Sequence, residues 1–322
     1  MVRLHVVVVL FAGAIVQSPA AIAGVRVLPD VPSYIWYCGC GPTAGGMIVG
    51  YWDAHGFDNL ILGSNSWTDN QQAVKDMIAS PEHIRDYWPT PDRAASEEDP
   101  YHEDDCLADF MRCSRNPLGE GQSYESMQYA GLIGYFAARG YVQSEGSYVP
   151  FSELWALLVS SINAARPMEF YVDSNSDGAA DHFVAVVGYD DAPGAEQYAF
   201  YDTYGTSIRW SPFRQNKKDV SYGIKTGTVF EPGVLAGDAN LDGTVDYLDL
   251  GALAASYRDS NCFWEDGDFT GDGLVDHLDL GALAGNYRRS ISPSLPNEAP
   301  EPGTLALLAA GAAASGVFRR RR

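Results

Sequence analysis

Both ends of the chain carry an uninterrupted apolar run. Residues 6–16 are apolar, Arg3 precedes them, and the small residues Ala21 and Ala23 follow. This order of regions is typical of a secretory signal peptide, so we expect residues 1–23 to be removed on export. The alternative is that the first apolar residues form a buried N-terminal strand.

The second apolar run lies near the C-terminus. Residues 290–303 are rich in Pro, Ser and Glu, as in a linker, and residues 304–318 are continuously apolar or small before four closing arginines. At about 1.5 Å per residue, this run spans about 22 Å, which is less than the roughly 30 Å of a hydrocarbon core. We therefore expect residues 304–322 to form a hydrophobic helix that serves as a sorting tail, with a plain short membrane anchor as the alternative.

Between these runs, the pattern predicts one helix and two neighbouring strands. Pro42 is typical of a first helical turn, and apolar residues recur after it on one face. The β-branched run after His182 predicts a buried strand, and the segment QYAFY before Asp202 predicts another. The sequence DDAPGAE between them has turn chemistry, so the two strands are expected to form a hairpin.

A cysteine, a histidine and an aspartate stand at the ends of these elements. Cys40 directly precedes the predicted helix, where unpaired amides and the helix dipole stabilise a thiolate. Cys38 beside it leaves a structural or disulfide role open for either residue. Counting from a turn centred on Ala192, His182 and Asp202 face each other across the hairpin. A cysteine followed by a histidine and an acid is the order of cysteine nucleophile chemistry.

Three motifs resemble the papain-fold, bacteriocin-processing-peptidase-like family. They are CGPT, DHFVAVVGYD and FYDTYGTSIRWSPF, and the resemblance extends over about residues 34–213. It implies an α+β papain-like domain at residues 24–230 that cleaves peptide bonds through a thioester. It also implies that Cys40 is the nucleophile, His182 the base and Asp202 the residue that orients the base.

The chain departs from that family at one position. The family usually places a Gln about six residues before the cysteine, where this chain has Tyr34. Losing one such oxyanion donor costs about a hundredfold or more in rate, and the Tyr34 hydroxyl or the Cys40 amide are the expected substitutes. The alternative function is a non-catalytic papain-fold binding module.

The sequence repeats itself between Gly237 and Tyr287. The segment GDANLDGTVDYLDLGALAASY aligns with GDFTGDGLVDHLDLGALAGNY. Each copy has oxygen ligands at loop positions 1, 3, 5, 9 and 12, a backbone carbonyl at position 7 and a glycine at position 6, which is the pattern of a calcium loop. The predicted ligands of two Ca²⁺ ions are Asp238, Asn240, Asp242, Thr244, Asp246 and Asp249, then Asp268, Thr270, Asp272, Leu274, Asp276 and Asp279.

Each loop leads into a predicted helix, and no helix precedes the first loop. This small all-α, duplicated loop-helix unit at residues 237–289 resembles a type I dockerin, which implies a cohesin-like domain of another protein as partner. Thr270 replaces the usual Asn or Asp, so the second site is expected to bind calcium more weakly. The segment holds 11 acidic and 3 basic residues, so we expect its folding to depend on calcium.

The tail has its own resemblance. Residues 300–302 read Pro-Glu-Pro, and with the short apolar segment and the arginine cluster they resemble the PEP-CTERM sorting signal of bacteria with exosortases. This implies an exosortase-type processing enzyme, membrane insertion through the tail, and delivery to the cell surface or beyond it.

Composition narrows the choice of partners. The formal net charge of −21 argues against nucleic acid, which needs clustered Lys and Arg. Five cysteines fit an oxidising compartment, and Cys106 and Cys113 are close enough in sequence to be a candidate pair.

Residues 173–181, DSNSDGAAD, are either a turn or a third calcium loop. The chain is thus expected to be a secreted or surface-displayed cysteine peptidase, tethered by a calcium-dependent module.

Overall fold

The computed structural model describes residues 24–57, 59–62, 71–87, 102–115, 118–141 and 144–291. The expected signal peptide, the hydrophobic tail at residues 304–322 and nearly all of the linker before it lie outside the described residues. Within the described part of the chain, none of the helices is long and apolar enough to span a membrane.

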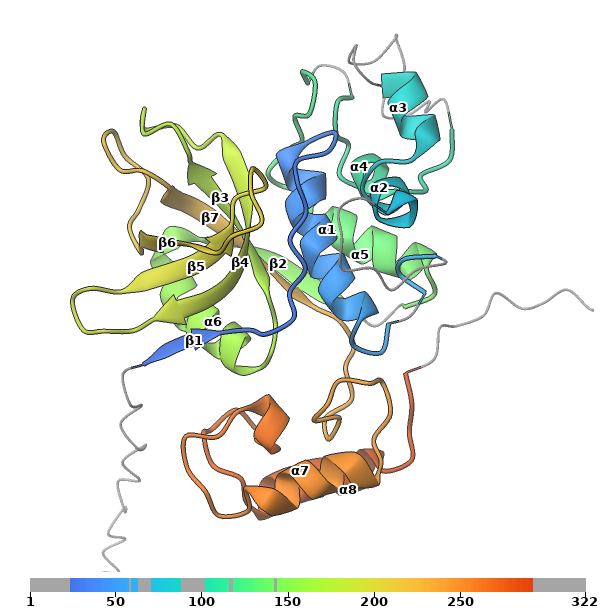
Figure 1. The fold of residues 1–322 in the computed structure, drawn as a ribbon, viewed down its shortest axis with the longest axis vertical. Helices are drawn as coiled ribbons and strands as arrows, with labels where there is room; N and C mark the ends of the chain where they lie inside the picture. Colours follow the sequence, from blue (N-terminus) through green and yellow to red (C-terminus); the bar gives the residue numbers. More distant parts are fainter. Residues whose placement is uncertain are drawn as a thin grey trace, which may run out of the picture.

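A buried helix, α1 (Cys40–Asp53), lies between the sheet and the other N-terminal helices (Figure 1). Every α1 residue after Cys40 is buried. Small residues permit this close packing: a Cβ added to Gly45 would meet Met111 at 2.6 Å, and one added to Gly46 would meet Ile78 at 2.9 Å. The surrounding helices are α2 (Gln72–Ile78), α3 (Pro81–Tyr87), α4 (Leu107–Phe110) and α5 (Met127–Ala138).

The other half of the domain is an antiparallel sheet with α6 (Phe151–Asn163) packed against it (Figure 1). The strand order is β2-β7-β3-β4-β5-β6, and β1 pairs with β4. The last strand of the domain therefore occupies an inner position between β2 and β3. The domain is α+β, with strands β1 (Val25–Val27), β2 (Glu145–Pro150), β3 (Met168–Asp173), β4 (His182–Asp190), β5 (Gln197–Tyr201), β6 (Arg209–Pro212) and β7 (Gly223–Glu231).

The repeat forms two loops, each followed by a helix. These helices are α7 (Tyr247–Ala255) and α8 (His277–Asn286), with the short 3-10 helix η1 (Trp264–Asp266) between them. The glycine that opens each loop packs on the buried leucine of the other repeat: a Cβ added to Gly237 would lie 2.6 Å from Leu283, and one added to Gly267 would lie 2.7 Å from Leu253. The two repeats therefore share one small core.

This C-terminal module packs against the α+β domain. The Arg26 side chain of β1 donates to the Glu265 carboxylate at 3.0 Å and lies over the Phe263 ring at 3.5 Å. On the other side, Gly56 beyond α1 packs on the backbone of Gly243 in the first loop. The module is therefore held on the domain through its first loop and through the segment around η1.

Candidate functional site

Cys40 is presented by an unusual turn at the start of α1. The two preceding residues have positive φ, 57° at Cys38 and 147° at Gly39. The Thr43 hydroxyl of the first helical turn lies 2.6 Å from the Gly39 carbonyl oxygen and accepts from the Tyr37 amide at 3.0 Å. These bonds hold the turn so that the cysteine side chain stands at the helix N-terminus.

The hairpin that carries the histidine has a different register from the one predicted. Ala185 of β4 pairs with Tyr201 of β5, and the ladder shifts between Val186 and Gly188. Counting three residues outward from Ala185 places His182 opposite position 204 rather than 202, so the predicted facing of His182 and Asp202 is wrong. Both residues are nevertheless close, because Nε2 of His182 lies 2.8 Å from the backbone carbonyl oxygen of Asp202.

The Asp202 carboxylate has other partners than the imidazole. It accepts from the amides of Tyr204 at 3.0 Å and Gly205 at 3.2 Å, and from Nη1 of Arg209 at 2.5 Å. The Tyr204 ring stacks on the His182 imidazole, with centroids 4.7 Å apart and planes 9° from parallel. The carboxylate thus shapes the turn that positions both the carbonyl and the ring against His182.

Burial sets the charge state of the cysteine and the histidine. It raises the pKa of the Cys40 thiol to about 12, although hydrogen bonds from the Phe183 and Gly41 amides oppose this rise. Burial also lowers the pKa of His182, against the effect of its bond to the Asp202 carbonyl. The thiolate expected at the helix start is therefore not favoured, because burial outweighs the Gly41 amide, and the shifts leave both groups neutral at pH 7. Phe183, whose amide bonds to the Cys40 sulfur, directly follows His182 in the chain.

Tyr34, one of the two expected oxyanion donors, lies elsewhere. Its hydroxyl is the nearest group to a Cβ built on Gly50. Gly50 is ten residues along α1 from Cys40, which corresponds to about 15 Å at the rise of an α-helix. The Tyr34 hydroxyl therefore cannot serve an oxyanion formed at Cys40.

Two further buried residues adjoin the cysteine. Gln128 of α5 packs on Gly41: a Cβ added there would lie 2.8 Å from its side-chain amide group. With its amide oriented to suit both neighbours, Gln128 donates to the Glu169 carboxyl group at 3.2 Å and accepts from Ser123. Burial raises the pKa of Glu169 well above its usual value. The sequence motifs predicted neither Gln128 nor Glu169 as a site residue. The one signal in the sequence is that Glu169 is a lone charged residue in the apolar strand MEFYV.

The two loops of the repeat, which are predicted to bind calcium, have matching internal hydrogen bonds. The Asp238 carboxylate accepts from the Gly243 amide at 2.9 Å, and Asp268 accepts from Gly273 at 2.7 Å. Burial, with the nearby charge of Asp249, raises the pKa of Asp238 to about 7. Buried carboxylates that repel each other in this way are a donor set that fits Ca²⁺, because a divalent cation would neutralise them.

Residues 173–181 form a loop of the same kind. The Asp173 carboxylate accepts from the Gly178 amide at 2.7 Å, and Asp177 accepts from the Ala179 amide at 2.8 Å. The first bond repeats the one between Asp238 and Gly243 in the first loop of the repeat. A turn and a third calcium loop both account for these bonds.

A separate polar cluster is centred on the buried Asp109 of α4. His83, Cys106 and Asp109 lie close enough to hold a metal ion. In the structure, however, the carboxylate accepts from donors: His83 at 2.7 Å, Cys106 at 3.0 Å and Arg115 at 3.0 Å. Burial alone would raise the pKa of Asp109, but the bonds from His102 and His83 hold it well below its usual range. Arg115 already supplies the positive charge that a metal would bring.

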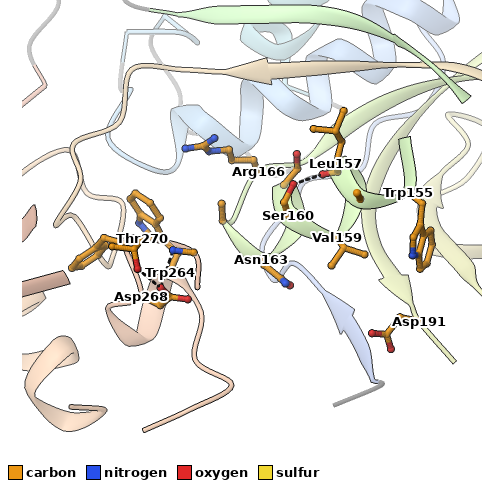
Figure 2. Close-up of a pocket in the computed structure, with 15 residues that line it drawn as sticks. Trp155, Leu157, Val159, Ser160, Asn163, Arg166, Asp191, Trp264, Asp268 and Thr270 are labelled. Carbon is orange, nitrogen blue, oxygen red and sulfur yellow. Dashed lines mark hydrogen bonds between the residues drawn. The ribbon is translucent and has the colours of Figure 1, made fainter. Parts of the chain in front are cut away.

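A cavity of about 620 Å³ lies away from Cys40, between α6 and the second loop of the repeat (Figure 2). Its wall on the domain side includes Trp155 and Asn163, and its wall on the module side includes Trp264 and Thr270. None of the three predicted catalytic residues lines it.

Residues 298–322 match the PEP-CTERM protein-sorting motif. This confirms the expected sorting signal: the chain is a secreted, cell-surface-associated protein whose C-terminal motif an exosortase recognises. Among solved structures, the chain is similar to SERA5E from Plasmodium falciparum, with 10% sequence identity, a TM-score of 0.30, and coverage of 64% of this chain and 91% of that one. No curated protein matches the sequence.

Proposed function

We propose that the chain is a secreted cysteine peptidase that cleaves a peptide or protein substrate through a thioester. The observation that supports this most is the position of the Cys40 sulfur, at the start of a buried helix and bonded to the amide beside His182. Nε2 of His182 lies 2.8 Å from the Asp202 carbonyl oxygen. Since a carbonyl only accepts, Nε2 carries the ring proton and Nδ1 is the nitrogen that accepts another.

In the proposed reaction, Nδ1 of His182 takes the thiol proton as the Cys40 sulfur attacks the substrate carbonyl carbon. The imidazolium gives that proton to the leaving amine, and a thioester remains on Cys40. A water molecule, deprotonated by the same nitrogen, then hydrolyses the thioester and restores the thiol. Asp202 orients the imidazole through its backbone carbonyl, and the Cys40 amide, at a helix start where amides have no intrahelical acceptor, serves the oxyanion.

The direct test is labelling with a thiol-reactive peptide epoxide, mapped by mass spectrometry. We expect the label on Cys40, and we expect His182→Ala to slow labelling by about a hundredfold or more, the usual contribution of a general base. His277→Ala, which removes an exposed histidine of the C-terminal module, is the matched control and should label like the wild type. Absence of label on Cys40, or equal labelling of the two histidine variants, would count against the peptidase.

The second candidate is a papain-fold binding module without catalysis. The raised pKa of Cys40 and the distant Tyr34 favour it, because a thiol that stays neutral and an oxyanion with one donor both slow acylation. On this hypothesis, the wild type binds a peptide but does not label Cys40.

We further propose that residues 237–289 bind two Ca²⁺ ions and a cohesin-like domain. The repeat exposes equivalent leucines on both helices, at 51% for Leu248 and 54% for Leu278, while Leu253 and Leu283 fill the core. Paired exposed apolar side chains are typical of an interaction surface. Calorimetric titration with a type I cohesin domain tests this: binding should require calcium and should weaken in a Leu248→Ala, Leu278→Ala chain. Unchanged binding in chelator would contradict it.

A further inference from the structure

The turn that presents Cys40 packs against a second cysteine from a distant part of the chain. Cys113 follows α4, and its Sγ lies 3.1 Å from the backbone carbonyl oxygen of Cys38. A Cβ added to Gly39 would lie 2.7 Å from the same sulfur. Cys38 and Cys113 are 3% and 0% exposed. Contact with the Cys38 side chain, ahead of burial, raises the pKa of Cys113 well above its usual value, so the two thiols are neighbours inside the core.

The other three cysteines have different surroundings. The Cys106 thiol donates to the Asp109 carboxylate at 3.0 Å, which argues against the expected pairing of Cys106 with Cys113. The Cys40 sulfur lies near enough to Cys113 for that residue to raise its pKa, but its own hydrogen bond is to the Phe183 amide. Cys262 lies in the C-terminal module, among its aspartates. Cys38 and Cys113 are therefore the pair that the fold brings together.

We propose that Cys38 and Cys113 form a disulfide bond when the chain is exported, while Cys40 remains a thiol. The sorting motif at residues 298–322 marks a secreted protein, and disulfides form in the oxidising compartments that such proteins enter. In the reaction both thiols lose their protons and one S–S bond forms. The two electrons pass to a disulfide-bearing thiol oxidoreductase, which is reduced to its dithiol.

The bond would fix the backbone directly in front of the proposed nucleophile. Cys38 has a φ of 57°, a conformation that residues with a Cβ adopt rarely. The cross-link joins positions 75 residues apart. A disulfide that closes so long a loop restricts the unfolded chain strongly and so favours the folded turn. The inference does not depend on the proposed peptidase activity, since a binding module would need the same turn.

Peptide mapping of the exported full chain tests the proposal. Trypsin cuts after Arg112, which separates Cys113 from Cys106, and a Cys40→Ser chain leaves Cys38 as the only cysteine between Arg26 and Lys75. We expect a non-reduced digest to contain these two peptides joined, and reduction to separate them. Recovery of both as free thiols would overturn the proposal, and so would a link from Cys113 to Cys106, or to Cys40 in the wild-type chain.

Thermal unfolding gives a second, independent measurement. A reducing agent should lower the melting temperature of the wild type and of the Cys106→Ser chain by several degrees, but not that of the Cys113→Ser or Cys38→Ser chains. An equal response of all four chains would contradict the bond. Neither measurement uses a substrate, so the disulfide and the labelling of Cys40 can fail separately.

Discussion

At the scale of single residues, the imidazole of His182 is held by a carbonyl and a ring instead of a carboxylate. Asp202→Asn keeps the carbonyl and leaves an acceptor for the turn amides. We therefore expect the variant to label Cys40 within about tenfold of the wild-type rate. If the carboxylate oriented the imidazole directly, replacing it by an amide would slow the reaction far more. In a serine protease triad this change lowers the rate about 10⁴-fold. Timed labelling separates the two outcomes.

The ring that stacks on His182 gives a complementary prediction. Tyr204→Ala removes an aromatic contact of the kind worth about 0.5–1.5 kcal/mol, so labelling should slow by up to about tenfold. Tyr204→Phe keeps the stack and should behave like the wild type. If the Phe variant is as slow as the Ala variant, the hydroxyl, 3.5 Å from Nδ1, is the group that matters.

The neutral state of Cys40 predicts a pH dependence. Because burial raises the thiol pKa to about 12, the thiolate fraction should grow about tenfold per pH unit between pH 7 and pH 10. Alkylation of Cys40 by a small uncharged reagent should rise with it, measured against a Cys40→Ser background. A rate that is already level at pH 7 would instead indicate a thiolate–imidazolium pair.

At the scale of elements, the buried carboxylate of Asp109 in α4 accepts hydrogen bonds from His83 of α3 and from Arg115. Asp109→Asn leaves the Arg115 guanidinium buried without its fully buried counter-charge, so we expect a loss of about 3–5 kcal/mol in the free energy of unfolding. Asp104→Asn is the matched control: it removes a partly exposed partner of the same arginine and should cost about 1 kcal/mol or less. Chemical denaturation of both variants gives the comparison.

The sequence predicted the elements better than their contacts. The helix after Cys40, the two strands and the loop-helix repeat follow from local patterns, and all are present. The hairpin register did not follow, because the shift between Val186 and Gly188 has no signal in an apolar run. Gln128 beside Gly41 could not be found either, since only the tertiary packing of α5 on α1 brings them together.

At the scale of the whole molecule, the C-terminal module, for which we propose calcium binding, is joined to the α+β domain by Arg26, Glu265 and Phe263. Removing calcium should therefore lower the melting temperature of the full chain, not only that of the module. A calcium titration of the full chain should give two ions bound, and a third would assign one to residues 173–181. Asp238→Ala should remove one ion; no change in stoichiometry would contradict the first site.

The inner position of β7 has a consequence for secretion. In the described residues, β2 hydrogen-bonds only to β7, which also pairs with β3. A chain that crosses a membrane from its N-terminus thus cannot complete this sheet until Glu231 has emerged. The sheet can therefore close only late in the passage of the chain, when the segment that leads into the C-terminal repeat emerges.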